Sequence, residues 1–137
     1  MYQFHYEWHL VFVCCEVAKA SLIRPIELKS LLSNALEEDR VQTCGVITAE
    51  LLQGCRHPKE QRFFQNHLGS LHYLEWPESD WTDLGEASSK LRSQGVTVPL
   101  MDLMIAHLAI KNASTVLHRD HHFELIAKHL PVRQEKV

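Results

Sequence analysis

Short apolar runs alternate along the chain with longer stretches in which apolar residues recur every three or four positions. The runs predict strands at 10–15, 41–44, 71–74 and 114–117. The first run is continuously apolar, which is typical of a strand covered on both faces in a parallel sheet. The helical spacing predicts helices over about 26–38, 48–52, 58–68, 77–92 and 100–109. This alternation predicts an α/β fold with a mainly parallel central sheet.

The chain length limits the number of domains. The 137 residues suit one domain with a single core. Residues 1–9 are rich in aromatic residues and histidine without a clear period, so we treat them as an uncertain leader. Gly95 follows the last residues of the helix predicted over 77–92, where a glycine commonly ends a helix. We therefore expect one domain over residues 1–137.

Composition and charge argue against some classes of function but do not identify one. The formal net charge of −3 argues against a strongly basic surface, but it allows a local basic patch for nucleic acid. The four cysteines form no C-x-x-C pair, and no secretory signal accompanies them, so we expect buried thiols and a cytoplasmic protein. The apolar run at 10–15 is too short to cross a bilayer, and we expect no membrane segment.

Three carboxylates stand at the junctions of the predicted elements. Glu50 follows the second strand, Asp102 begins the helix near residue 100, and Asp120 follows the last strand. In parallel sheets, ligands bind beyond the carboxyl ends of the strands. Carboxylates gathered there are the oxygen donors that Mg²⁺ and Mn²⁺ prefer, and such ions activate water for phosphodiester hydrolysis.

A simpler interpretation needs no metal. Asp102 would be a first-turn carboxylate stabilised by the helix dipole, Asp120 would cap a helix beginning at His121, and Glu50 would be solvated. Spacing alone favours this interpretation over a metal site.

Three sequence segments carry a resemblance that favours the metal site. Residues Thr48–Gly54, Leu91–Ala106 and His118–Glu124 resemble, in order and spacing, the motifs of the PIN domain, and specifically those of the VapC-type toxins of bacterial toxin–antitoxin pairs. The resemblance covers roughly residues 26 to 130. It implies a three-layer α/β/α sandwich and an endoribonuclease. It also implies a Mg²⁺ or Mn²⁺ cofactor, a small antitoxin partner and a homodimer.

The resemblance assigns the site residues by position. Glu50 matches the glutamate of the second motif, and Asp102 and Asp120 match the aspartates of the third motif and of the last strand. All three are implied as metal ligands and catalytic residues. One position departs, because the first strand of the family ends in aspartate and this chain has Cys14 there, followed by Cys15 and Glu16. A thiol is a poor ligand for Mg²⁺, so we expect weak metal binding and impaired cleavage.

Histidines and tryptophans offer further candidates. His122 stands where many relatives carry an acid, and the run His118–His122 suggests a zinc site, although ligands this close in sequence rarely converge on one tetrahedral ion. His107 and His129 lie in apolar helical patterns, so we expect packed or surface residues there. Trp81 falls on the apolar face of its helix, which predicts a core position.

Three functions remain open from the sequence. The first is a metal-dependent endoribonuclease toxin that hydrolyses RNA and is bound by an antitoxin. The second is a catalytically degenerate PIN domain that binds antitoxin or RNA, which the missing first aspartate favours. The third is an unrelated α/β protein with surface carboxylates. The expected RNA contacts are basic residues: Arg56, Lys59, Arg62, Lys90, Arg92 and Arg119.

Overall fold

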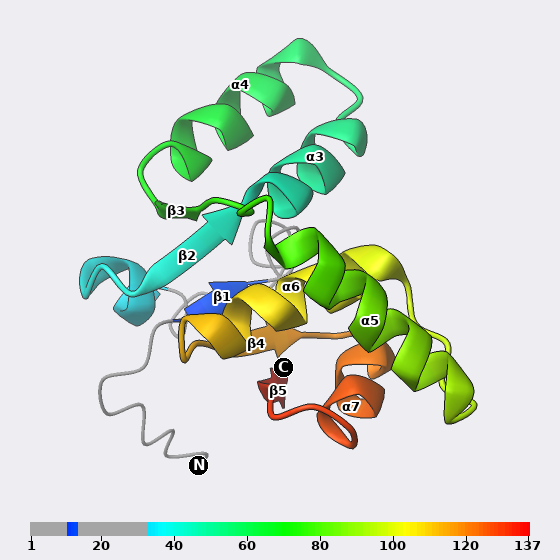
Figure 1. Cartoon of the computed structure of the whole chain (residues 1–137). Helices are drawn as coiled ribbons and strands as arrows, with labels where there is room; N and C mark the ends of the chain where they lie inside the picture. The colour runs from blue at the N-terminus through cyan, green and yellow to red at the C-terminus, as the bar shows by residue number, and fades with distance from the viewer. Residues whose placement is uncertain (1–10, 14–32) are drawn as a thin grey trace.

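Five short strands form one sheet in the order β3-β2-β1-β4-β5, and all four neighbouring pairs are parallel (Figure 1). This computed structural model describes residues 11–13 and 33–137. The strands are β1 (Val11–Val13), β2 (Val41–Cys44), β3 (His72–Leu74), β4 (Thr115–His118) and β5 (Arg133–Lys136). The α/β fold class with a parallel sheet, expected from the sequence, is confirmed.

Helices fill the connections between the strands. They are α3 (Gly45–Gln53), α4 (Pro58–Leu68), α5 (Asp80–Ser93), α6 (Leu100–Lys111) and α7 (His121–Ala127). A helical segment over 33–37 also precedes β2, within the helix predicted over 26–38, whose first residues lie outside the described part of the chain. Gly95 has φ +79, a left-handed conformation that glycine adopts without strain, and it follows α5 as its position in the sequence predicts. Within the described residues, none of the helices is long and apolar enough to cross a membrane.

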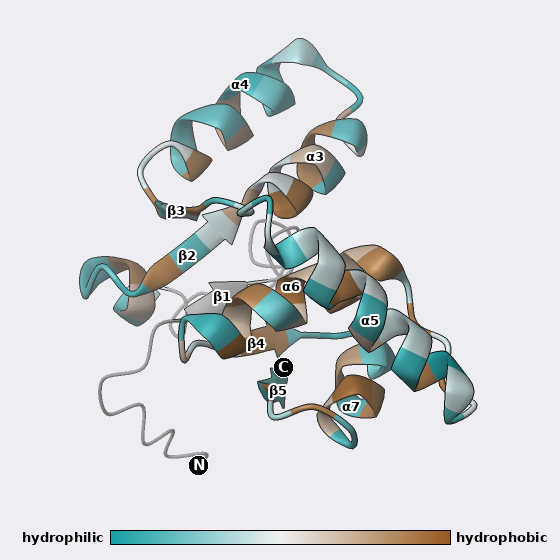
Figure 2. Ribbon diagram, viewed as in Figure 1, coloured by the Kyte–Doolittle hydropathy of each residue, from teal (hydrophilic) through white to brown (hydrophobic). Residues whose placement is uncertain are grey.

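The main core lies between the sheet and α6. Figure 1 shows α6 crossing in front of β1 and β4, with α5 packed outside it, and Figure 2 shows apolar residues on both α6 and β4. Leu103, Ile105 and Ala106 of α6 are at most 1% exposed, as are Val116 and Leu117 of β4. Burying a leucine, isoleucine or valine side chain stabilises the fold by roughly 1.5–3 kcal/mol. This packing holds α6 against β4.

The strand order reverses its direction beside β1. From β1 the chain proceeds through β2 and β3 towards one edge of the sheet, and then crosses to β4 and β5 at the other edge. Right-handed crossovers running in opposite directions put their helices on opposite faces, which gives the three-layer arrangement. The reversal lies between β1 and β4, and ligands bind beyond the carboxyl ends of the strands at such a point.

One strand and one core position differ from the expectation. The sequence analysis missed β5, because its residues Arg133–Lys136 are polar and form an edge strand. Trp81 was expected in the core, but it is 52% exposed and packs on Trp76, with 5.2 Å between the ring centroids. Its neighbour Asp80 is the buried residue at the start of α5, at 3% exposure. The prediction for Trp81 was therefore wrong.

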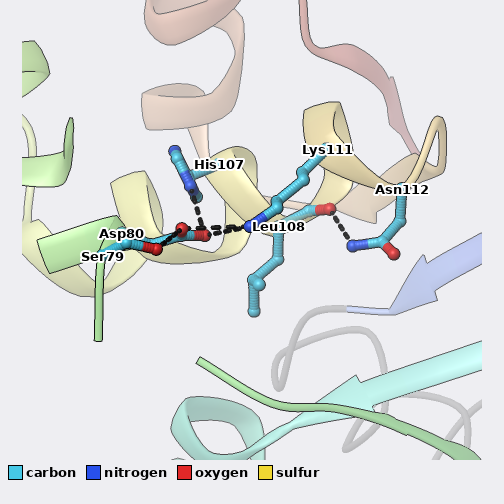
Figure 3. A network of polar contacts seen from close by, with 6 residues as sticks. All are labelled: Ser79, Asp80, His107, Leu108, Lys111 and Asn112. Carbon is cyan, nitrogen blue, oxygen red and sulfur yellow. Dashed lines mark hydrogen bonds and ion pairs between the residues drawn. The ribbon is translucent and has the colours of Figure 1, made fainter. Parts of the chain in front are cut away.

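Asp80 is buried because it joins α5 to α6 through charged side chains (Figure 3). Nζ of Lys111 donates to both of its carboxylate oxygens, at 3.0 and 2.8 Å, and Nε2 of His107 lies 3.0 Å from Oδ2. These contacts, the one with Lys111 first, hold the pKa of Asp80 below its usual value. His107 is thus a packed residue, as predicted, and His129 is a surface residue.

Removing the charge of Asp80 should destabilise the domain, because Lys111 and His107 would lose their shared partner at the α5–α6 contact. We expect Asp80→Asn to lower the thermal unfolding midpoint clearly more than Glu86→Gln, which changes an exposed glutamate on the same helix. Thermal unfolding followed by circular dichroism measures both variants. Equal midpoints for the two would show that the Asp80 contacts contribute nothing to stability.

Candidate metal site

Two of the three predicted carboxylates lie at the ends of elements that meet near the point where the strand order reverses. Asp102 is in the first turn of α6, and Asp120 follows the end of β4 and is the N-cap residue of α7. Glu50 lies on α3, directly after β2, and its charge acts on Asp102. The three residues come from segments far apart in the sequence. The topology therefore brings Asp102 and Asp120 to one imidazole, near the point where the strand order reverses.

His122 lies between Asp102 and Asp120. Its Nδ1 is 3.0 Å from Oδ2 of Asp102 and 3.0 Å from Oδ1 of Asp120. The atom is buried and makes no well-aligned hydrogen bond. Both carboxylate oxygens are nevertheless within hydrogen-bonding distance of it, so the two contacts are short but poorly aligned. The sequence analysis noted His122 only as a departure from the family, and its closeness in sequence to Asp120 was the available signal.

The protein environment shifts the pKa values of the two aspartates in opposite directions. Burial, the charge of Asp120 and that of Glu50 raise the pKa of Asp102 from 3.8 to about 6, against the opposing effect of His122. Burial acts in the same direction on Asp120, but the hydrogen bond from the backbone N–H of His122 and the nearby ring outweigh it. The pKa of Asp120 is therefore held below its usual value. Asp102 is thus a carboxylate whose charge lacks sufficient compensation from the protein.

The simpler interpretation of the carboxylates accounts for part of this geometry. Asp120 does cap α7, since its Oδ1 accepts the backbone N–H of His122 at 3.0 Å. A capping role does not explain Asp102, because a first-turn carboxylate stabilised by the helix dipole would have a lowered pKa. A strongly raised pKa beside other carboxylates is instead typical of a functional site.

The residues present fit a divalent cation. A cation between the carboxylates would remove the repulsion that Asp102 experiences, and the buried Nδ1 of His122 would gain a partner. Asp102 and Asp120 would hold such an ion, with Glu50 beside them. Carboxylate oxygens suit Mg²⁺ and Mn²⁺.

The run His118–His122 does not converge as a zinc site would require. His118 is fully buried on β4, where its Nε2 lies 2.5 Å from Oε1 of Gln134 and its ring packs on Phe123. Potential ligand atoms of Asp120, His121 and His122 do lie within 4.8 Å of one another. His118 is therefore a structural residue, and the second half of the run belongs to the carboxylate site.

Cys14 and Glu16, on which the question of the missing aspartate rests, lie outside the described residues. The last described residue of β1 is Val13, which pairs with Leu117 of β4. The strand that precedes Cys14 in the sequence is thus the one between β2 and β4. The expected role of this position stays a prediction.

The raised pKa of Asp102 predicts how stability varies with pH. The folded state holds this proton more tightly than the unfolded state, so the carboxylate costs stability as the pH rises from about 4 through about 6. The difference between 3.8 and about 6 corresponds to about 3 kcal/mol. Solvent screening of this partly exposed group reduces the cost to roughly 1–2 kcal/mol.

We therefore expect Asp102→Asn to stabilise the metal-free domain by roughly 1–2 kcal/mol at pH 7.5, and by less at pH 4.5. Urea unfolding of both proteins in EDTA at the two pH values measures this difference. A variant that is less stable than the wild type at pH 7.5 would show that the Asp102 charge is compensated in the fold.

Comparison with known proteins identifies the family. The model of the PIN domain family matches residues 19–129. Ribonuclease VapC11 of Mycobacterium tuberculosis is 29% identical over 108 residues, which cover 77% of this chain and 79% of that protein. VapC ribonuclease Mb1587 of Mycobacterium bovis matches with the same identity and the same coverage.

Solved structures show the same fold at lower sequence identity. VapBC2 of Rickettsia felis, bound to a DNA fragment from its promoter, matches with a TM-score of 0.78 and 15% identity, over 93% of this chain and 98% of the matched chain. DNA-bound VapBC of Salmonella typhimurium matches with a TM-score of 0.77 and 17% identity, over 94% and 98% of the two chains. Together with the family match over most of its length, these similarities show that the chain belongs to the PIN domain family.

Proposed function

We propose that this protein is a metal-dependent endoribonuclease of the toxin type, which hydrolyses phosphodiester bonds in RNA with Mg²⁺ or Mn²⁺. The proposal rests mainly on the raised pKa of Asp102. This partly buried carboxylate has a pKa of about 6 beside the charges of Asp120 and Glu50. The ribonucleases of the two Mycobacterium species, related over three quarters of the chain, support the reaction class. The proposed metal ligands and catalytic residues are Glu50, Asp102 and Asp120.

The protein contributes position and charge to this reaction. A bound Mg²⁺ or Mn²⁺ supplies Lewis-acid polarisation of a phosphate oxygen and a bound water of lowered pKa. Asp120 is held in place by the backbone N–H of His122, and Asp102 is held by the buried residues that follow it on α6. Rigid ligands keep the ion and the scissile phosphate in reacting geometry, which is the main source of rate in such sites.

RNA would approach through exposed basic residues. Arg119 precedes Asp120 and is exposed, and Arg56, Lys59 and Arg62 are exposed at the start of α4. Lys90 and Arg92 are exposed near the end of α5. Such residues would bind phosphates through charge rather than read bases, so binding should weaken with salt.

The proposed setting is a toxin–antitoxin pair in the cytoplasm. The solved relatives include VapBC toxin–antitoxin complexes, which supports a small antitoxin as the partner here. Apolar residues are available for contact with another protein, since Phe63, Tyr73, Leu100 and Met101 are each at least 41% exposed. A homodimer is proposed on the same grounds as the antitoxin, by similarity to the family.

An RNA cleavage assay tests the proposal. The purified chain is incubated with single-stranded and structured RNAs in Mn²⁺, in Mg²⁺ and in EDTA. We expect endonucleolytic fragments with either ion and none in EDTA. Metal-independent cleavage would contradict the mechanism, and RNA binding without cleavage would favour the degenerate binding module that Cys14 suggests.

A further inference from the structure

The donor atoms around Asp102 include a nitrogen. Nδ1 of His122 lies 3.0 Å from a carboxylate oxygen of Asp102 and 3.0 Å from one of Asp120. The atom is buried and makes no well-aligned hydrogen bond, although both carboxylate oxygens lie close to it. A buried nitrogen with such poorly aligned contacts could be satisfied better by a further partner. Here it faces the two carboxylates proposed to hold the cation.

The chain fixes His122 in this place through its backbone. The backbone N–H of His122 donates to Oδ1 of Asp120, which caps α7, so the position of the imidazole is tied to that of the carboxylate. The next residue, Phe123, is 1% exposed and anchors the first turn of α7 in the core. The side chain of His122 itself is 24% exposed. The imidazole is thus held at the edge of the site by a buried support.

The type of donor matters for the choice of ion. Mg²⁺ binds oxygen ligands and demands near-ideal octahedral geometry, whereas imidazole nitrogen suits transition metals. A site of carboxylates alone would bind both ions through oxygen. Adding an imidazole nitrogen should strengthen binding of Mn²⁺ and heavier transition ions and leave Mg²⁺ without a comparable gain.

We propose that His122 is a nitrogen ligand of the cation site and makes it selective for Mn²⁺ or another first-row transition ion over Mg²⁺. The inference rests on the proposed function, because it assigns one more ligand to the same site. The observation that supports this inference is the position of Nδ1 between the carboxylates of Asp102 and Asp120. The inference also accounts for the poorly aligned contacts of that atom with the two carboxylates.

Metal binding measured by calorimetry at pH 8 tests the selectivity without any RNA. For the wild type we expect Mn²⁺ to bind at least about tenfold more tightly than Mg²⁺. His122→Phe, which keeps a ring but removes the nitrogen, should lose most of that preference. His122→Asp, which offers oxygen instead, should tighten Mg²⁺ binding and bring the two affinities closer together.

His129→Asn is the matched control. His129 lies just after α7, is exposed, and belongs to neither cluster of potential ligand atoms in the described residues. We expect this variant to keep the wild-type preference. An equal loss of preference in His129→Asn and His122→Phe would overturn the proposal, because the effect would then not depend on the imidazole beside Asp102 and Asp120.

A spectroscopic measurement separates a ligand from a residue that only supports the site. Electron spin echo spectroscopy of bound Mn²⁺ should show coupling to a directly ligated ¹⁴N in the wild type and not in His122→Phe. Bound Mn²⁺ without nitrogen coupling would overturn the inference while leaving the carboxylate site intact. Absence of any bound Mn²⁺ or Mg²⁺ would overturn the inference and the metal dependence of the proposed function together.

Discussion

Asp102→Asn is expected to reduce RNA cleavage in Mn²⁺ by about 100-fold or more. The amide has the shape of the carboxylate but no charge, so the proposed cation would lose a ligand whose pKa is raised by burial and by neighbouring carboxylates. A hundredfold loss is equivalent to about 2.7 kcal/mol of transition-state stabilisation, which is within what a metal ion contributes to such a reaction. Initial rates on a labelled RNA at saturating Mn²⁺ measure it.

The stability of the same variant makes this result interpretable. Asp102→Asn is expected to fold at least as well as the wild type at neutral pH, so lost activity cannot be attributed to unfolding. Asp83→Asn removes an exposed carboxylate from α5 and should leave the rate unchanged. Wild-type rates in Asp102→Asn would exclude Asp102 from the catalytic site.

Cys14→Asp is expected to raise Mn²⁺ affinity and RNA cleavage by about tenfold or more. Cys14 follows β1, which lies between β2 and β4 where the strand order reverses, and the family has aspartate at this place. A carboxylate is a far better ligand than a thiol for a hard cation, and an added charged ligand strengthens the binding of such ions. Calorimetry and initial cleavage rates measure the two effects.

Cys55→Asp is the control for the added charge. Cys55 is partly buried just after α3, and its Sγ donates to the carbonyl oxygen of Leu51. This variant should gain neither affinity nor activity. If Cys14→Asp behaves like Cys55→Asp, the missing aspartate does not limit this protein, and the degenerate binding module loses its main support.

The regular elements were predictable where burial determines the sequence. Strands β2 and β4 are fully buried, and the helical spacing of α6 reflects its contact with the sheet. Prediction failed where polar residues take structural positions. The edge strand β5 pairs with β4 through its backbone, so its polar side chains gave no signal. Asp80 takes the buried position at the start of α5, and Trp81 stays at the surface.

The sequence suggests the residues of the candidate site, but it does not give their contacts. Asp102 and Asp120 were identified from their places after predicted elements and from the resemblance to the PIN domain. Their separation in pKa depends on burial and on the three-dimensional positions of Glu50 and His122. The contact of one imidazole nitrogen with both aspartates depends on how α6 and α7 pack together, which spacing along one chain cannot give.

A crystal soaked in Mn²⁺ and measured at the manganese absorption edge tests the central claim most directly. The claim predicts an anomalous peak in contact with Asp102 and Asp120 at the carboxyl end of β4. A second cluster provides the internal comparison, since ligand atoms of Asp80, Asp83 and His107 also lie within 4.8 Å of one another. A peak at that cluster alone, or no peak at Asp102 and Asp120, would contradict the claim.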